Sequence, residues 1–360
     1  MRVLVFGGAG YIGSHAALVL LSRGHDVVVA DNLSNGSFIV IERLEALSGR
    51  KPAFIRIDLR ESESVTRLFQ EGHFDAVLHF AALKSVGDSC SRPLEYFDNN
   101  ISGTIQLLLA MQTSGCKRLV FSSSATVYGE PEHVPIDETA PLRITNPYGR
   151  SKLVMEELIG DACKADPSLT AINLRYFNPV GAHPSGLIGE SPNGVPDNLM
   201  PYICQVASGQ RESLSVFGDD WPTPDGTGIR DYIHVMDLAE AHAIALERIP
   251  GIHGNLALNL GTGKGTSVME LINGFERING IRIPHRIVGR RPGDVAEAYA
   301  DPTKAHNVLG WRSTRGVDEM CRDAWNWQRI TPRGYHAPSG NDPSTIENPH
   351  PSARAPIITA

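Results

Sequence analysis

The chain opens with a short apolar run that leads directly into a cluster of glycines. Residues 1–13 read Met1-Arg2-Val3-Leu4-Val5-Phe6-Gly7-Gly8-Ala9-Gly10-Tyr11-Ile12-Gly13. The run is typical of a buried strand, and the glycines satisfy both the GxGxxG and the GxxGxxG spacing. Glycine permits a tight turn from strand to helix and lets the backbone approach a pyrophosphate, whose charge then meets the N–H groups of the helix N-terminus. The stretch therefore predicts a dinucleotide site at the first turn of an α/β fold.

Short β-branched runs alternate with longer amphipathic stretches through the first half of the chain, as in a parallel sheet covered by helices. We expect strands at Arg2–Phe6, Asp26–Asp31, Ala53–Asp58, Ala76–Phe80, Arg118–Ser122 and Thr170–Tyr176. We expect helices at about Ile12–Arg23, Ser62–Glu71, Pro93–Ser114 and Pro147–Cys163. The pattern predicts an α/β fold with a Rossmann-type doubly wound parallel sheet.

The rhythm changes after Asn178, where Pro, Gly and Asp crowd Pro179–Asn198 and later Gly218–Gly228 into long loops of the kind that cover a site. The chain then returns to the sheet through Asp231–Val235, a helix at Asp237–Arg248 and an apolar run at Leu256–Leu260. We therefore expect two interleaved units, a dinucleotide-binding domain of residues 1–177 with 231–261 and a smaller mixed α/β substrate-binding domain of residues 178–230 with 262–331. Residues 332–360 are rich in Pro, Ser and Asn and are expected to form a flexible tail.

The composition argues against several classes of function. The 360 residues carry 33 Lys and Arg against 40 Asp and Glu, a formal charge of -7, so a broad electrostatic grip on nucleic acid or on an anionic membrane is not expected. Anionic ligands must therefore meet locally placed cations. The sequence has neither an apolar run of about 18 residues nor a secretory leader after Met1, so we expect a cytoplasmic protein.

The cysteines and histidines predict no metal site. The cysteines are scattered without a CxxC pair, and the 13 histidines form no HxxxH or HExxH pattern. We interpret the five cysteines as small buried hydrophobes: Cys90, Cys116, Cys163, Cys204 and Cys321.

Acidic and small residues stand at the ends of three of the expected strands, at the sheet edge where the glycine turn lies. Asp31 would accept hydrogen bonds from the adenosine ribose hydroxyls and would repel a 2′-phosphate, which favours NAD over NADP. Asp58-Leu59 would lie near an adenine ring, although Asp58 also fits a helix N-cap. Phe80-Ala81-Ala82 leaves room for a flat cofactor or simply packs the strand.

Tyr148 and Lys152 are four positions apart in a segment that begins Asn146-Pro147, as a helix does. This spacing places both side chains on one helix face, with their Cβ atoms about 5–6 Å apart. A phenol has a pKa of about 10, and a neighbouring ammonium together with a positive nicotinamide ring favours its ionised form. Within Ser122-Ser123-Ser124 we select Ser124 as the hydroxyl that bonds the substrate oxygen losing its proton.

These stretches resemble the extended short-chain dehydrogenase/reductases, and among them the enzymes that invert C4 of UDP-sugars. The resemblance runs from Met1 to about Tyr335. Its specific motifs are Gly7–His15, Asp31-Asn32, His79-Phe80-Ala81, Leu94–Asn100, Ser122–Gly129, Tyr148–Lys152, Arg175–Gly181, Asn198–Tyr202, Asp225–Leu238 and Arg290–Asp294.

The resemblance implies an NAD that stays bound, Tyr148 as catalytic acid and base, Lys152 as its electrostatic helper and Ser124 as its hydrogen-bonding partner. It also implies a homodimer joined by helices at about Leu94–Ser114 and Tyr148–Cys163. The expected cofactor-binding residues are Gly7, Gly10, Tyr11, Ile12, Gly13, Asp31, Asn32, Asp58, Leu59, Phe80, Ala81, Lys84, Asn99, Ser122, Tyr148, Lys152 and Phe177. The expected UDP-sugar residues are Ser124, Tyr148, Asn178, Asn198, Leu199, Phe217, Arg230, Tyr232, Arg291, Asp294 and Ala298.

Three of these positions carry a further expectation, two from their own chemistry and one from the resemblance. Arg230 and Arg291 have fork-shaped donors that suit the oxygens of a diphosphate. Ala298 stands where some related epimerases have a Tyr whose bulk limits N-acetylated sugars, so UDP-N-acetylglucosamine and UDP-N-acetylgalactosamine are also expected substrates.

Other functions remain open on the same fold. Sugar-nucleotide 4,6-dehydratases share the glycine turn and the Tyr/Lys pair but have an Asp-Glu pair directly after the hydroxyl residue. This chain has Ala125 and Thr126 there, and neither titrates. A UDP-uronate decarboxylase would release carbon dioxide, and a non-catalytic NAD-sensing protein would bind NAD without turnover.

Overall fold

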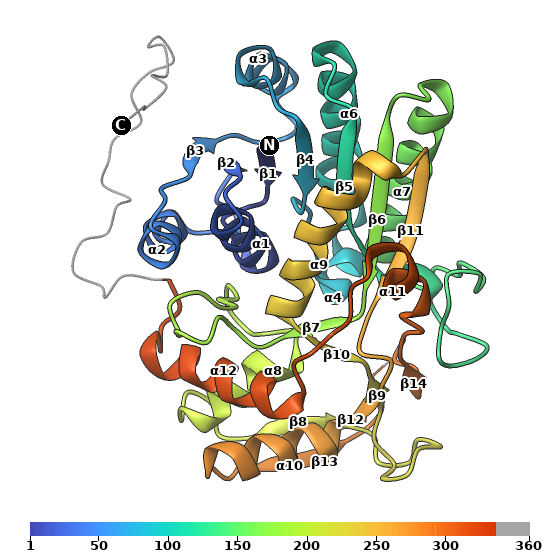
Figure 1. Ribbon diagram of the computed structural model, residues 1–360. Helices are drawn as coiled ribbons and strands as arrows, with labels where there is room; N and C mark the ends of the chain where they lie inside the picture. The colour runs from blue at the N-terminus through green and yellow to red at the C-terminus, as the bar shows by residue number, and fades with distance from the viewer. Residues whose placement is uncertain (292, 336–360) are drawn as a thin grey trace.

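The computed structural model describes residues 1–291 and 293–335, and its centre is a seven-stranded parallel sheet (Figure 1). The strands lie in the order β11-β6-β5-β4-β1-β2-β3. Their bounds are β1 Arg2–Phe6, β2 Asp26–Asp31, β3 Ala53–Arg56, β4 Ala76–His79, β5 Arg118–Ser124, β6 Thr170–Tyr176 and β11 Asn255–Leu260. The order reverses between β1 and β4, so the glycine turn after β1 lies at the switch point where doubly wound sheets bind ligands. The predicted fold class is confirmed.

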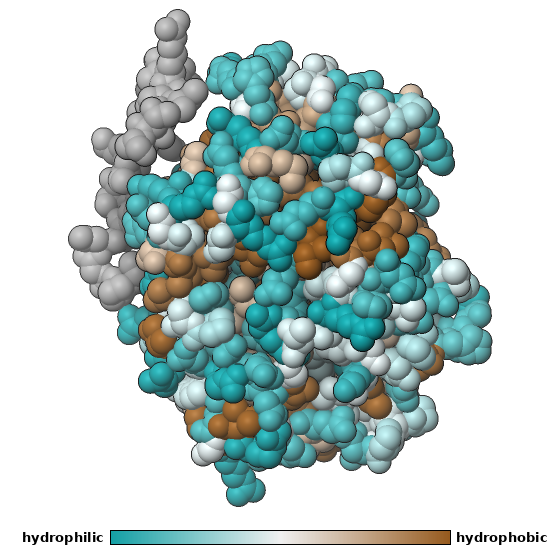
Figure 2. Space-filling view, in the orientation of Figure 1, coloured by the Kyte–Doolittle hydropathy of each residue, from teal (hydrophilic) through white to brown (hydrophobic). Residues whose placement is uncertain are grey.

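Alternate residues of each strand enter two separate hydrophobic cores, because successive strand side chains point to opposite faces. Val3 and Val5 pack with α1 (Tyr11–Ser22), α2 (Ile39–Ser48) and α9 (Val235–Arg248). On the other face, Leu4 and Phe6 share a core with α3 (Ser62–Gly72), α6 (Gly103–Ser114) and α7 (Pro147–Ala165). The sheet is therefore covered on both sides, and Figure 2 shows a surface on which hydrophilic residues dominate and hydrophobic ones are interspersed.

A smaller part of the molecule lies beyond the carboxyl ends of the strands, at the bottom of Figure 1. Its own core includes Met200, Ile203, Leu271, Phe275 and Met320. Its helices are α8 Leu199–Ala207, α10 Val268–Asn279 and α12 Val317–Ile330. Its strands are β7 Asn178–Val180 paired with β10 Tyr232–His234, β8 Leu214–Phe217 paired with β13 His285–Val288, and β9 Ile229–Arg230 between β12 Thr266–Ser267 and β14 Glu297–Ala298. The long loops 181–198 and 218–228 belong to this part.

The helix predicted over Pro93–Ser114 is interrupted. The chain forms α5 (Pro93–Phe97), a π-helical turn at Asp98–Ser102 and then α6, and a further short helix, α4 (Val86–Ser91), precedes them. The cause is tertiary, because Asn100 is fully buried and its amide donates to the Leu83 carbonyl and to Ser151 Oγ. The π-helical turn carries this buried amide, and periodicity alone cannot reveal its long-range partners.

Other boundaries also differ from those predicted. β5 continues to Ser124, α2 was not expected, and the helices of the smaller part have no counterpart in the predicted elements. The short helix α11 (Thr303–Leu309) packs into the core of the large sheet, although the predicted domain bounds place it in the second unit.

The interpretation of every cysteine as buried was wrong for Cys90, which is exposed, whereas the other four are buried. Cys90 lies on α4, a short surface helix that the sequence pattern did not indicate.

The predicted tail begins within packed structure. Tyr335 lies against Trp327, with ring centroids 4.9 Å apart, and its hydroxyl accepts a hydrogen bond of 3.2 Å from the Gly189 N–H. Packing therefore extends to Tyr335, and the remainder of the predicted tail, residues 336–360, lies outside the described residues.

A buried ion pair joins α7 to the sheet. The Glu156 carboxylate accepts three hydrogen bonds from the Arg175 guanidinium of β6, the shortest 2.6 Å, and a fourth from Ser123 Oγ of β5. The two charged side chains are only 6% and 7% exposed. Removing one partner would leave a buried charge without compensation.

We therefore expect Glu156→Ala to lower the free energy of unfolding by about 3–5 kcal/mol, measured by urea denaturation. The matched control is Asp161→Ala on the same helix, because Asp161 and its partner Lys164 are both largely exposed. The control should change stability by no more than about 0.5 kcal/mol. Equal losses in the two variants would contradict this view of the pair.

Candidate active site

The turn after β1 forms a compact cradle at the N-terminus of α1. Gly7 has φ +75, and a Cβ there would lie 2.7 Å from the Ala81 nitrogen, while a Cβ at Gly13 would lie 2.2 Å from the Gly7 oxygen. Gly10 is the N-cap of α1 and supplies no side-chain cap, so the first-turn N–H groups of Tyr11, Ile12 and Gly13 are left for another acceptor. This geometry fits the pyrophosphate of a dinucleotide.

Asp31, at the end of β2, is buried beside this cradle. Its carboxylate accepts hydrogen bonds from the Ala9 N–H at 3.0 Å and from the Leu33 N–H at 2.8 Å. Burial raises the pKa of Asp31, and the two backbone donors oppose that shift. Each carboxylate oxygen retains a lone pair, so the group can also accept from a ribose hydroxyl.

Asn32 and Asp58 bring the second and third strand ends together, since the Asn32 amide donates to Asp58 at 3.0 Å. Asp58 also forms a bidentate pair with Arg60, which holds the pKa of the carboxyl well below its usual value. Leu59 is buried against Gly103 at the start of α6. The predicted N-cap role of Asp58 was wrong, because α3 begins at Ser62 with Glu61 as its N-cap, and Asp58 instead accepts the N–H of Arg60 two residues later. Its predicted place near an adenine ring stays a prediction.

The segment after β4 supplies four more of the expected cofactor residues. Phe80 packs against His242 of α9, with ring centroids 4.7 Å apart, and Ala81 lies against Gly7. The Asn99 amide donates to Asn100 at 2.9 Å, within the π-helical turn. Lys84 reaches across to the smaller part, where its ammonium pairs with Glu190 at 2.9 Å.

The N-terminal half of α7 brings Tyr148 and Lys152 to the carboxyl end of β5. Asn146 caps the helix by accepting from the Gly149 N–H at 2.8 Å, and Pro147 occupies the first turn. The Lys152 ammonium is 6.0 Å from the Tyr148 ring centroid and donates to the Ser122 carbonyl at 2.8 Å. Both side chains are buried, so the expected pair lies on one face as its spacing predicts.

Burial shifts both titrating groups of this pair toward their neutral forms. It lowers the pKa of Lys152 to about 7, against the opposing charge of Glu156. Burial also raises the pKa of Tyr148 to about 12, and a hydrogen bond with Ser124 opposes that rise. The protein without ligands therefore keeps the phenol protonated at neutral pH.

The serines at the end of β5 separate into different roles. Ser122 shares a short hydrogen bond with the Tyr176 hydroxyl, and Ser123 bonds Glu156. Ser124 Oγ accepts from the Thr126 N–H at 3.2 Å and from its hydroxyl at 3.0 Å, and it retains its own proton to donate. Of the three, Ser124 is the one whose hydroxyl lies near enough to the Tyr148 phenol to lower its pKa.

A second group of expected residues gathers in the smaller part. The Arg291 guanidinium bonds Asp294 at 2.8 Å and lies 5.4 Å from the centroid of the Phe217 ring. The Arg230 guanidinium lies 4.0 Å from the same carboxylate, and Asp294 thus stands between two cations. Phe217 is 42% exposed, which leaves its ring available to a planar ligand.

Three further expected substrate residues lie on the short strands of the smaller part. Asn178 of β7 pairs in register with Tyr232 of β10, and Ala298 of β14 pairs in register with Arg230 of β9. Burial raises the pKa of Tyr232 to about 12. Phe177 lies in a small core that Ala298 also contacts.

Asn198 and Leu199 form the start of α8. Asn198 is the N-cap residue, but its side chain does not cap the helix and instead donates to Glu190 at 2.9 Å. Glu190 was missed by the sequence reasoning, as were the Glu156–Arg175 pair and Tyr176. The four-residue spacing from Lys152 to Glu156 could have indicated Glu156, whereas Glu190 lies in a loop without periodicity.

Two features are absent from the described residues, 1–291 and 293–335. They contain no group of His, Cys, Asp or Glu that could hold a metal ion. None of the helices among them is both long and apolar enough to cross a membrane.

Comparison with known proteins defines the class. The family profile described as GDP-mannose 4,6 dehydratase matches residues 4–324. With this fold, glycine turn and Tyr/Lys pair, the chain belongs to the extended short-chain dehydrogenase/reductases.

Individual relatives give the narrower family. The UDP-glucose 4-epimerase of Bacillus subtilis (strain 168) is 53% identical over 335 residues, which are 93% of this chain and 99% of that protein. A crystal structure of the epimerase from Stenotrophomonas maltophila, with bound NAD and formylated UDP-arabinopyranose, is 54% identical with a TM-score of 0.91 and covers 92% and 99% of the two chains. The Bifidobacterium longum epimerase in complex with NAD+ and UDP is 48% identical with a TM-score of 0.90, covering 93% and 100%. The chain belongs to the UDP-glucose 4-epimerase family.

Proposed function

We propose that this protein catalyses the reversible epimerisation of UDP-glucose and UDP-galactose at C4, through a 4-keto sugar and with a tightly bound NAD. The observation that carries the proposal is the arrangement of Tyr148, Lys152 and Ser124 at the end of β5, in the same molecule as a glycine cradle and a pair of arginines. Family membership at 53% identity supports it.

The chain's own residues move one proton. NAD, when bound, would supply a reversible acceptor for the hydride at C4 of the sugar. Tyr148 accepts the proton of the sugar 4-hydroxyl and later returns it, and the Ser124 hydroxyl donates a hydrogen bond to that oxygen. The Lys152 ammonium stabilises the phenolate, which the ligand-free protein disfavours because the site is buried.

Inversion needs tight binding at the nucleotide and loose contact at the sugar, since the keto sugar must present both faces. Arg230, Arg291 and the exposed Phe217 ring would hold the diphosphate and the uracil. A diphosphate would compete with Asp294 for both guanidinium groups, and charge-assisted bidentate hydrogen bonds favour the phosphate oxygens.

Dehydration is disfavoured by the two residues directly after Ser124. Ala125 and Thr126 begin a 3-10 turn, and the Thr126 hydroxyl donates a hydrogen bond to Ser124 Oγ. Neither residue titrates, so the extra acid and base that elimination of water requires are absent from these two positions.

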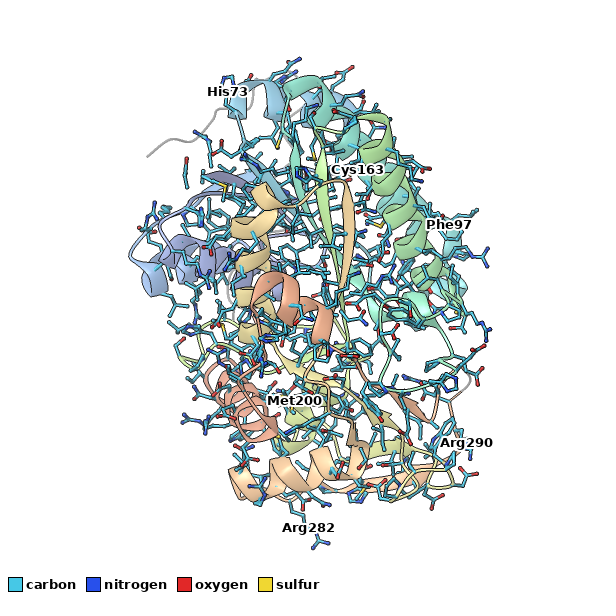
Figure 3. The ribbon with its side chains drawn as sticks, turned by 45° about the vertical axis from the view of Figure 1, so that its right-hand side comes forward. His73, Phe97, Cys163, Met200, Arg282 and Arg290 are labelled. Carbon is cyan, nitrogen blue, oxygen red and sulfur yellow. The ribbon has the colours of Figure 1, made fainter. Side chains whose placement is uncertain are left out.

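We further propose a homodimer formed through α4, α5, α6 and α7. Four large apolar residues on the first three of these helices are exposed, with Leu94 79% and Leu109 50% exposed, together with Val86 and Ile105. Phe97, labelled in Figure 3, lies on the same side of the molecule as α7. A measured solution mass equal to that of a single chain would contradict this proposal.

Two expectations from the sequence stand as proposals. Residues 1–177 with 231–261 bind the dinucleotide, and the smaller part binds the UDP-sugar. We also propose a cytoplasmic location, which the five unpaired cysteines support because reducing compartments keep thiols free.

The direct test of the function is incubation of the purified protein with UDP-galactose, without added NAD, followed by chromatographic separation of the UDP-hexoses. UDP-glucose should appear until both sugars reach equilibrium, with no accumulation of NADH in solution. Intact UDP-galactose beside tightly bound NAD would indicate a non-catalytic NAD-binding protein. Release of carbon dioxide from UDP-glucuronate would indicate a decarboxylase.

Tyr148→Phe should lower the rate of epimerisation by about 10²–10⁴-fold, because the proton acceptor is removed. The variant should retain bound NAD, measured by its release on denaturation. Tyr202→Phe is the matched control, since Tyr202 lies on α8 and is stacked on Arg211. Full activity of Tyr148→Phe would remove this residue from the mechanism.

Ala298→Tyr should lower turnover of UDP-N-acetylglucosamine and UDP-N-acetylgalactosamine far more than turnover of UDP-glucose. The reason is steric, because Ala298 is in register with Arg230, where the nucleotide sugar is expected. Steady-state kinetics with acetylated and non-acetylated substrates measure the ratio. An equal loss on both would refute the steric account and leave the loop 181–197 to set the size of the pocket.

A further inference from the structure

One carboxylate oxygen connects the two expected ligand sites. Glu190 lies in the loop between β7 and α8, and its side chain is only 9% exposed. Its Oε1 accepts a hydrogen bond of 2.9 Å from the Lys84 ammonium and another of 2.9 Å from the Asn198 amide. Lys84 follows β4 of the large sheet and is an expected dinucleotide residue, whereas Asn198 precedes α8 and is an expected substrate residue.

The backbone on either side of Glu190 is fixed by α12 and by Tyr335. Trp327 Nε1 donates to the Glu190 carbonyl at 2.9 Å. A Cβ at Gly189 would lie 2.4 Å from the Trp327 ring, so the loop packs closely on the indole. Met200 lines a small cavity together with Glu190 and Trp327, and Figure 3 shows it within the smaller part. The backbone of Glu190 is therefore held in place, and the orientation of its carboxylate depends on Lys84 and Asn198.

The chemistry of the three groups makes their orientations interdependent. An ionised carboxylate only accepts hydrogen bonds, so the Asn198 amide must turn its Nδ2 toward Glu190. The Oδ1 atom and the second N–H of Asn198 can then bind a ligand. The Asn198 side chain performs no capping, although it occupies the N-cap of α8. Lys84 has three N–H groups and can hold Glu190 and an anionic ligand together.

We propose that Glu190 is a positioning residue that couples the two ligand sites, so that a uridine nucleotide bound at Asn198 slows the release of the dinucleotide held by Lys84. This inference rests on the proposed function. A ligand that orders Asn198 also orders Glu190 and Lys84, and the second ligand then meets groups already in place. By linkage, the dinucleotide strengthens binding of the nucleotide by the same factor.

The test measures NAD release from the full-length holoprotein with and without UDP, which cannot be turned over. Release is followed by passing the protein through a desalting column at intervals and quantifying the NAD that remains bound. UDP should slow release from the unchanged protein by about 10-fold, within the usual range of coupling between two sites. In Glu190→Gln the effect should fall below about twofold, because Gln both donates and accepts and no longer pairs with an ammonium.

The matched control is Asp323→Asn, which removes another buried carboxylate from the smaller part. Asp323 pairs with His234 at 3.2 Å and is 7% exposed, and neither Lys84 nor Asn198 is among its partners. This variant should keep the UDP effect even if its melting temperature falls. If Glu190→Gln does not fold, Lys84→Met removes the other half of the pair and should also abolish the UDP effect.

An undiminished UDP effect in Glu190→Gln, or the lack of any UDP effect in the unchanged protein that binds UDP by calorimetry, would overturn the inference. Either result leaves epimerisation of UDP-galactose intact. Failure of the proposed function is recognised separately, because the unchanged protein would then bind no UDP or would not interconvert the UDP-hexoses.

Discussion

A buried ammonium group is the constraint on which the active site depends. Lys152 is 2% exposed and donates to the Ser122 carbonyl, and its charge is offset by Glu156 one turn further along α7. Burial is costly for a cation, so the surrounding charges must be arranged to retain it. The Glu156–Arg175 pair therefore links the chemistry to the fold, because the same carboxylate ties α7 to β5 and β6 and its charge also raises the pKa of Lys152 against the effect of burial.

The same burial explains why the two ligands must act together. With Tyr148 at a pKa of about 12 and Lys152 at about 7, the ligand-free protein is not yet a competent base. The bound cofactor and sugar must complete the electrostatics. Two hydrogen bonds join the large sheet domain to the smaller part. The Tyr11 hydroxyl donates to the Gly181 carbonyl, and the Lys84 ammonium donates to Glu190. They join the glycine cradle to the smaller part, which we propose binds the nucleotide sugar.

The local features of the fold and site could be predicted from the sequence. The glycine turn, Asp31 and the Tyr148/Lys152 pair each follow from short-range spacing, because a turn, a strand end and a helix face are set by neighbouring residues. The π-helical turn at 98–102 could not be predicted, because the buried Asn100 amide donates hydrogen bonds to Leu83 and Ser151, which are distant in sequence. Glu190 was missed for the same reason, because it lies in a loop and its partners are 106 and 8 residues distant.

The central claim is that the hydrogen taken from C4 of the sugar returns to C4 from the opposite side. Its most direct measurement uses UDP-galactose carrying deuterium at C4, converted in ordinary water and followed by mass spectrometry and proton NMR of the UDP-glucose formed. The account predicts complete retention of deuterium at C4. Replacement of that deuterium by hydrogen from the solvent would contradict it.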